Sequence, residues 1–407
     1  MQRVAAVRLG IFRALAALVL AVAQDLAHAQ APLGSPIVVG AVVSQTGLAS
    51  TLAAGYRNGI LLWQSQLNAA GGLLGRPVEV RIADDGSGAE EAAKQYARLI
   101  ENDKAAVLIG PYGSAATLTA AGVAEQARRI MLNGAGASGE IYKRGLRYVF
   151  QVATPYAVYG DGVPPLAKQW NAGKLFVIAR SDPVARAMAS ALVTEAAKRG
   201  VAASPVQSFP LDTLEFDDFV SEAKVQNAHA WIAFGSARDA ANMVISFKRL
   251  GYTPSMFVAR GAEQAEFITR VGQDAEYAIG IAAWTPTLRT PGNAAFVQAY
   301  RARWSAEPDL AAAQGYSACR VLEAAVRRAG SVDSERLRAT LETLETETPL
   351  GRYRTAPGTG RQIAAQAVLV QILKGRGEVI WPPALATARA VLPYPRWDQR
   401  TLMTAGE

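Results

Sequence analysis

The sequence has few of the residues that most enzymes use for metal binding and nucleophilic catalysis. Its 407 residues include one cysteine, Cys319, and two histidines, His28 and His229. One cysteine excludes an intrachain disulfide and a cysteine-cluster metal site, and the usual zinc sites need more His and Cys ligands than this. No P-loop and no G-x-S-x-G motif occurs. We therefore expect no cofactor, no metal and no enzymatic activity.

Long hydrophobic runs are also rare, and the main one lies at the N-terminus. Residues 1–29 combine three arginines with an apolar stretch, Ile11–Ala23, and end in the tripeptide A-H-A. This order is typical of a secretory signal peptide, and an apolar core of about ten residues is shorter than the roughly 20 that span a bilayer. We therefore predict a signal peptide over residues 1–29, cleavage before Gln30 and export of the mature chain.

Charge of one sign is not concentrated in patches. The chain has 42 Lys and Arg against 34 Asp and Glu, a net charge of +8, and no basic cluster with interleaved aromatics that would predict nucleic-acid binding. Hydrophobic residues make up 50% of the chain and charged residues 19%. This is ample material for a large core and excludes global disorder, and the length indicates two domains.

Short β-branched runs alternate with helical stretches along the mature chain. Residues 37–43 form the first run, and in the helix predicted over 52–69 Tyr56, Ile60 and Trp63 recur at steps of four and three. This β-α order predicts parallel sheets with helices on both faces, and a Pro-, Gly- and Tyr-rich stretch at 154–161 separates two such series into two lobes. Further strands are predicted at 77–83, 106–110, 129–132, 148–152, 174–179, 206–209, 230–234, 256–259, 279–284, 364–370, 371–374 and 379–381, and further helices at 89–102, 114–127, 185–199, 216–226, 239–250, 293–306, 311–329 and 334–343.

Two glycine-containing loops follow predicted strands, which is where ligands bind in open α/β sheets. In residues 110–114, Gly113 lets a ligand approach the backbone, and Ser114 caps a helix whose free amides suit a carboxylate. A plain N-cap accounts for this loop equally well. Residues 133–139 match G-x-G-x-x-G, but too few residues follow for a full helix, so we reject a dinucleotide site. We expect instead a backbone-lined pocket edge near Gly136 and Ser138.

Three other features receive a structural interpretation. Asp84-Asp85 at a strand end is a candidate pair of acid–base carboxylates, but a solvated turn before a helix is favoured. Cys319 lies in the middle of a predicted helix, where we expect a buried small residue. His229 precedes a strand, and we predict a structural role for it.

Several motifs occur together in an order that indicates a family. They are I-V-V-G at 37–40 with Q-T-G at 45–47, N-A-A-G-G-L-L-G-R-P at 68–77, D-D at 84–85, and I-G-P at 109–111 followed by Ser114. Over about residues 37–381 the chain resembles the periplasmic binding proteins of branched-chain amino-acid ABC transporters, the leucine/isoleucine/valine-binding type. The resemblance implies an α/β architecture, the type I periplasmic-binding-protein fold. In it, two doubly wound parallel-sheet lobes joined by three crossovers close over a ligand as a Venus flytrap.

The resemblance also implies how the chain is divided and what it does. We expect residues 36–155 with 286–360 to form the first lobe, and residues 156–285 with 361–397 to form the second. The expected protein is a periplasmic monomer that captures a small carboxylate solute and delivers it to the permease subunits of an ABC importer. The alternative is a protein of the same fold that senses a ligand and signals to a partner.

Members of this family hold the ligand carboxylate between two loops of the first lobe. Carried over to this chain, the resemblance assigns this role to Ser114 with Gly113, and to the loop of Gly136, Ala137 and Ser138. Ala137 stands where a Ser or Thr hydroxyl is usual. This departure removes one side-chain hydrogen bond and leaves backbone groups to compensate.

The second lobe departs further from the family pattern. Val184 stands where a tyrosine usually closes over the ligand, and Arg260 falls at or near the acidic residue that pairs with the ligand ammonium, with Glu263 close by. An arginine repels an ammonium but binds a carboxylate through two hydrogen bonds. We therefore hypothesise a ligand without a free α-ammonium, or with a second anionic group, such as an aromatic or dicarboxylic acid. Trp284 is expected as an aromatic wall, and Tyr156 as a ligand contact or a hinge-packing residue.

Overall fold

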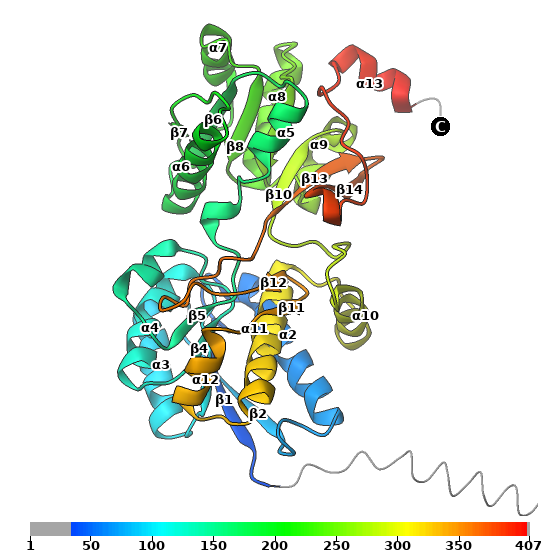
Figure 1. Ribbon diagram of the computed structural model, residues 1–407. Coiled ribbons are helices and arrows are strands. Elements are labelled where there is room, and N and C mark those ends of the chain that lie inside the picture. The colour runs from blue at the N-terminus through cyan, green and yellow to red at the C-terminus, as the bar shows by residue number, and fades with distance from the viewer. Residues whose placement is uncertain (1–33, 405–407) are drawn as a thin grey trace, which may run out of the picture.

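Residues 34–404 are described by a computed structural model, which shows two α/β lobes joined by extended segments (Figure 1). The first lobe contains a five-stranded sheet in the order β2-β1-β3-β4-β5, with all neighbouring strands parallel. Its strands are β1 (Ile37–Val43), β2 (Val78–Asp84), β3 (Val107–Ile109), β4 (Met131–Asn133) and β5 (Val149–Gln151). The predicted signal peptide lies outside the described residues.

Helices cover both faces of the first sheet. One face packs against α2 (Ser50–Ala69) and α11 (Leu310–Ala329), and the other against α3 (Ala89–Glu101) and α4 (Ser114–Gln126). Side chains alternate along a strand, so Val39 and Ala41 enter the core with α2 and α11, whereas Val42 enters the core with α3 and α4. A strand buried on both faces needs apolar residues at nearly every position, which is the pattern of Ile37–Val43. The same lobe contains α10 (Asn293–Trp304), α12 (Ser334–Leu341), β11 (Thr346–Thr348) and β12 (Gly351–Tyr353).

The second lobe contains a seven-stranded sheet in the order β14-β13-β10-β9-β8-β6-β7. β10 to β7 are parallel, whereas β13 and β14 are antiparallel additions at one edge. The strands are β6 (Leu175–Arg180), β7 (Gln207–Phe209), β8 (Ala230–Phe234), β9 (Met256–Arg260), β10 (Ile279–Ala282), β13 (Val368–Leu373) and β14 (Arg376–Trp381). Helices α5 (Val163–Gln169) and α6 (Pro183–Lys198) cover one face, and α7 (Asp217–Val225), α8 (Ala237–Arg249) and α9 (Ala265–Val271) cover the other.

The alternation of strands and helices predicted from the sequence is confirmed, with β1 and β8 at their predicted bounds. The prediction of separate strands at 364–370 and 371–374 is wrong, because β13 runs through the boundary between them. Gln371 is fully buried there, and its amide donates to the carbonyl oxygens of Tyr277 at 3.0 Å and Val391 at 2.9 Å. A polar residue satisfied in this way does not end a strand. Sequence patterns also missed α5, α9 and the β11–β12 hairpin.

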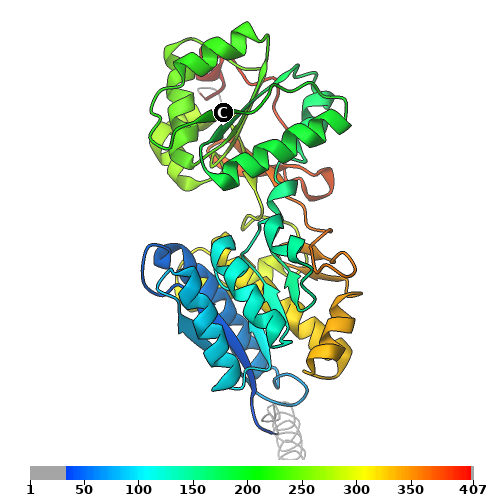
Figure 2. The ribbon, with the colours of Figure 1, turned by 90° about the vertical axis from the view of Figure 1, so that its left-hand side faces the viewer.

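The two lobes are continuous through three stretches of chain. The chain leaves the first lobe after β5, returns after β10, and leaves it again after β12. Figure 2 shows these stretches between the lobes. In the part of the chain that the structure describes, no helix combines the length and apolar character needed to span a membrane.

Two glycines set the close approach of α2 to α11. A Cβ at Gly59 would lie 2.1 Å from the carbonyl oxygen of Ala312, and one at Gly315 would lie 2.2 Å from the carbonyl oxygen of Tyr56. Real Cβ atoms do not come this close to backbone oxygens, so both helices would have to move apart. The position of α2 therefore depends on these two residues.

Gly59→Ala is expected to destabilise the protein by about 1–3 kcal/mol, the usual cost of overpacking a core. Gly122→Ala is the matched control, because Gly122 lies within α4 and an added Cβ there meets open space. The control is expected to stabilise the helix by up to about 1 kcal/mol. Urea unfolding of both variants measures the difference, and equal stability of the two would contradict the close helix contact.

Candidate functional site

The first loop of the site follows β3 and leads into α4. The Tyr56 hydroxyl donates to the carbonyl oxygen of Gly110 at 2.9 Å and thereby connects α2 to the start of this loop. Gly113 has a φ of 93°, which glycine adopts without strain, and occupies the N-cap of α4. The predicted N-cap role of Ser114 is therefore wrong, because the turn at Gly113 places Ser114 inside the first turn of the helix.

Ser114 connects the two loops that the sequence singled out. Its Oγ accepts a hydrogen bond from the amide of Ser138 at 3.2 Å, which leaves the hydroxyl proton to donate to a ligand. Within α4 no side chain caps the first turn, and that turn contains no acidic residue. Uncapped amides at a helix start attract an anion, so Ser114 and these amides form a suitable carboxylate site.

The second loop is held by Asn133, a residue that sequence reasoning did not select. Its Nδ2 donates to the carbonyl oxygen of Gly136 at 2.7 Å, and its Oδ1 accepts from the Gly136 amide at 2.7 Å. A Cβ at Gly136 would lie 2.6 Å from Thr117 Oγ1, so glycine is needed where the loop passes α4. The Ala137 carbonyl accepts from the Tyr156 amide at 3.1 Å, which connects the loop to the first crossover.

The helix that follows this loop is short. Ser138 accepts a hydrogen bond from the Glu140 amide at 3.3 Å and caps a six-residue 3-10 helix, Gly139–Arg144. The prediction that no full helix follows the glycine motif is confirmed, and this loop lacks the long helix of a dinucleotide site.

Aromatic side chains and one arginine meet between the lobes. The ring of Tyr112 lies 6.0 Å from that of Tyr56, and the ring of Tyr156 lies 5.9 Å from that of Tyr159. Burial raises the pKa of both Tyr112 and Tyr159, and the positive charge of Arg260 opposes this rise at each tyrosine. Arg260, at the end of β9, therefore lies near the first-lobe loop that carries Tyr112 and near the first crossover. We take Ser114, the 136–138 loop, Tyr112, Tyr156 and Arg260 together as the candidate interlobe site.

Arg260 is half-buried and has no acidic partner. Its Nη1 donates to the carbonyl oxygen of Gly235 at 2.9 Å, and it forms no ion pair among the described residues. The carboxylate of Glu263 instead accepts from the Gly261 amide at 2.8 Å and from the Gln264 side chain at 3.3 Å. Burial raises the pKa of Glu263, and the charge of Arg260 opposes this shift. Arg260 is thus a cation free to bind an anion.

The remaining predicted site residues occupy different surroundings. Val184 lies in the first turn of α6, where its amide donates to Asp182 Oδ1 at 3.0 Å, and its side chain packs on the second-lobe core. Trp284 is 5% exposed in the first-lobe core, and its Nε1 donates to Asn293 Oδ1 at 2.7 Å. Its ring therefore has no open face for a ligand in the described conformation. Cys319 is fully buried, as predicted, whereas His229 is exposed at the start of β8.

Two α/β lobes with polar loops at their facing strand ends define the class of type I solute-binding proteins. Comparison with known sequences supports this class: the family described as periplasmic binding protein matches residues 36–377. The chain belongs to the periplasmic binding protein family, as the resemblance of its motifs predicted.

Individual relatives agree with this assignment. Leu/Ile/Val-binding protein homolog 7 of Brucella suis is 24% identical over 394 residues, which cover 92% of this chain and 98% of the relative. A leucine-binding protein of Thermotoga maritima has a TM-score of 0.68 at 23% identity, with coverage of 84% and 97% of the two chains. A solute-binding protein of Rhodopseudomonas palustris in complex with 3,4-dihydroxybenzoic acid has a TM-score of 0.69 at 19% identity, with coverage of 90% and 99%. Both structures share the fold.

The carboxylates of Asp84 and Asp85 accept hydrogen bonds from backbone amides and do not act as a pair on each other. Asp84 accepts hydrogen bonds from the amides of Gln45 at 2.8 Å and Gly86 at 2.9 Å, and from the Thr46 hydroxyl at 2.7 Å. Asp85 is 2% exposed and accepts from the Ser87 amide at 2.8 Å. The expected turn is present, but Asp85 is buried rather than solvated. Asp84 thus fixes the loop between β1 and α2.

The hydrogen bonds to Asp84 lower its pKa from 3.8 to about 2. Because the pKa is lower in the folded state, the stabilisation by Asp84 is complete above about pH 4 and is lost as the pH falls toward 2. Asp84→Asn is therefore expected to reduce stability at about pH 6, by an amount that shrinks in acid. Denaturant unfolding at a series of pH values measures this, with Asp212→Asn as the control on an exposed loop. If Asp84→Asn lost the same free energy of unfolding at every pH, the lowered pKa of Asp84 would be contradicted.

Proposed function

We propose that this chain is the substrate-binding protein of an ABC importer, and that it captures a small carboxylate in the interlobe site and delivers it to the permease. It is exported to the periplasm by a cleaved signal peptide and works as a monomer. The observation that carries the proposal is the half-buried Arg260, which forms no ion pair among the described residues and whose charge acts on Tyr112 of the first lobe. Membership of the periplasmic binding protein family supports it.

The first lobe supplies the site for the ligand carboxylate. The Ser114 hydroxyl and the uncapped amides of α4 donate to its oxygens, and the Ala137 position contributes backbone groups only. Tyr156 lies against the same loop, because its backbone amide donates a hydrogen bond to the Ala137 carbonyl oxygen, and its ring adds an aromatic contact. These groups lie on elements held by Asn133 and Tyr56, so the site is formed before the ligand binds.

The second lobe selects against a free ammonium. Arg260 would repel it, and the Glu263 carboxylate is engaged by its own loop. Val184 presents no hydroxyl. The ligand is therefore an aromatic or other organic acid, or an amino acid derivative whose amino group is absent or neutral. Among the relatives, one is named for leucine, isoleucine and valine, and one holds 3,4-dihydroxybenzoic acid.

Closure of the lobes follows because the ligand contacts residues of both lobes. We propose lobe boundaries at residues 36–155 with 286–360, and 156–285 with 361–397. A ligand that touches Ser114 in one lobe and Arg260 in the other binds the closed form more tightly than the open form and shifts the population toward closure. The closed form is the state that the permease recognises.

A thermal-shift screen of the chain from Gln30 onward is the test of this function. The panel contains aliphatic amino acids, aromatic acids, dicarboxylates and small amides. A ligand at 100 times its Kd adds about 2.7 kcal/mol of stability, and we expect such shifts from acids that lack an ammonium group. Strong shifts from leucine or valine alone would contradict the role given to Arg260.

Arg260→Gln is expected to lower the affinity for the most tightly bound acid by about 10- to 100-fold, because a hydrogen bond to a charged group contributes about 1.5–3 kcal/mol. Arg376→Gln is the matched control, since Arg376 is an exposed arginine of the same lobe. Ser114→Ala is expected to lower the affinity for the same acid, because it removes the hydroxyl that donates to the ligand carboxylate. Calorimetric titration gives the three values, and unchanged affinity in Arg260→Gln would remove that residue from the site.

A further inference from the structure

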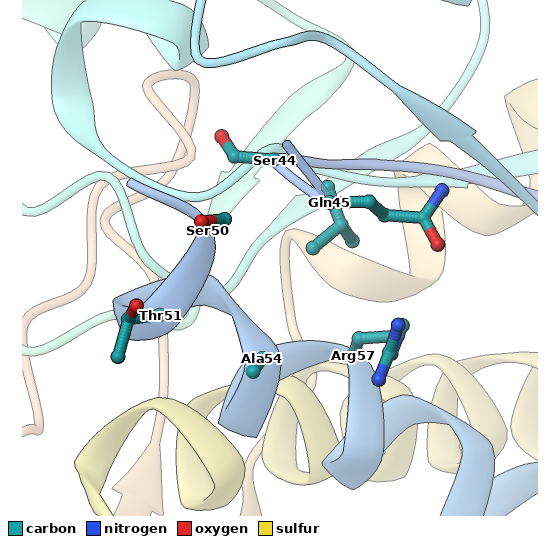
Figure 3. Close-up of a pocket in the computed structure, with 7 residues that line it drawn as sticks. Ser44, Gln45, Ser50, Thr51, Ala54 and Arg57 are labelled. Carbon is teal, nitrogen blue, oxygen red and sulfur yellow. The ribbon is translucent and has the colours of Figure 1, made fainter. Parts of the chain in front are cut away.

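A polar cavity lies at the end of β1 in the first lobe. It has a volume of about 270 Å³. Figure 3 shows Gln45 and Arg57 on one side of it and Ser44, Ser50 and Thr51 on the other. No Asp or Glu lines it, so its only charged group is the Arg57 guanidinium.

The sequence of α2 explains how the cavity forms. Ser50, Ala54 and Arg57 follow one another at steps of four and three, so they share one face of the helix. The small side chain of Ala54 leaves the space that a larger residue would fill. Tyr56 and Ile60 point the other way, into the first-lobe core, and fix the rotation of α2 about its axis.

Arg57 is a cation without a counter-charge. Its Nε is shielded from solvent and has no hydrogen-bond partner, and its Nη2 has only a long contact of 3.5 Å to Asn58 Oδ1. Among the described residues Arg57 forms no ion pair. The nearby acid, Asp309, accepts from the Ala312 amide at 2.8 Å and caps α11. Leaving the shielded Nε without a hydrogen-bond partner is unfavourable, and an anion in the cavity supplies one.

The chain segments that form the cavity are neighbours of the loop that leads to Ser114. Ala41 of β1 pairs with Ile109 of β3 in parallel register, so the segments after the two strands lie side by side. Tyr56, which precedes Arg57, bonds to Gly110 in the loop that leads to Ser114. Tyr112 packs on Tyr56 and is close enough to Arg260 for that charge to act on it.

We propose that this cavity is the first lobe's subsite for a second acidic group on the ligand, with Arg57 as its cation. The inference rests on the proposed function and narrows the ligand class to diacids. One carboxylate binds at Ser114. The other enters the cavity, accepts hydrogen bonds from Arg57 and the Thr51 hydroxyl, and meets Arg260 when the second lobe closes. An arginine suits this role because its planar fork matches a carboxylate.

Matched pairs of acids test the subsite by calorimetric titration. The probes are benzoate against isophthalate and terephthalate, and pentanoate against glutarate. In the wild-type protein the best diacid is expected to bind at least about 10-fold more tightly than its monoacid, the factor that about 1.4 kcal/mol produces. Arg57→Gln is expected to abolish this preference while changing the affinity for the monoacid by less than about threefold.

Two further variants test whether a lost preference for the diacid arises from the cavity itself. Ala54→Leu fills the cavity without changing the charge and is expected to remove the preference for the diacid as well. Arg336→Gln makes the same substitution on the exposed surface of α12 and is expected to keep it. Thermal unfolding confirms that each variant is folded.

The outcomes distinguish this inference from the function on which it rests. Binding of monoacids with no diacid preference, or a preference that survives Arg57→Gln, overturns the subsite and leaves the proposed function intact. Absence of binding by every acid contradicts the proposed function, and the subsite with it.

Discussion

The parallel register of β1, β3 and β4 is the constraint on which the site depends. Parallel strands end at the same edge of their sheet, so the segments after these three strands lie side by side. They carry Ser44, Gly113 with Ser114, and the 136–138 loop. Helices α2 and α4 start at this edge and present their N-terminal turns to it. The close contact of α2 with α11, made possible by Gly59 and Gly315, fixes the position of α2 in this arrangement.

Under the proposed function, electrostatics distinguishes the candidate site from one built for an amino acid. An amino acid presents an anion and a cation, and a matching site needs donors at one end and an acid at the other. Here the interlobe site contains the cation Arg260, and the cavity at the end of β1 contains the cation Arg57, neither of them in an ion pair among the residues that the structure describes. Glu263 is the nearby acid, and its carboxylate serves its own loop. This arrangement is the basis of our proposal that the ligand has acidic groups at both ends.

Much of the fold could be predicted from the sequence, because strands buried on both faces and amphipathic helices leave clear periodic patterns. The strand prediction was wrong at Gln371, because this buried polar side chain donates a hydrogen bond to the carbonyl oxygen of Val391, 20 residues further along the chain. The sequence also led to the proposed carboxylate site at Gly113 and Ser114, but it did not predict the conformation of Gly113. Arg57 was not selected from the sequence, because its proposed role depends on the small Ala54 beside it and on the lack of an ion-pair partner among the described residues, and both are three-dimensional facts. Trp284 was selected by its position in the family pattern, yet it packs in the core.

The most direct measurement of the central claim is a calorimetric comparison of leucine with 4-methylpentanoate, the same molecule without its amino group. The two ligands differ only in the ammonium, so their Kd ratio reports the charge that the second lobe presents to it. Since Arg260 has no ion pair among the described residues and Glu263 accepts hydrogen bonds from its own loop, we predict that 4-methylpentanoate binds more tightly than leucine. Tighter binding of leucine would show that an acid meets the ammonium, and it would contradict the account given for the second lobe.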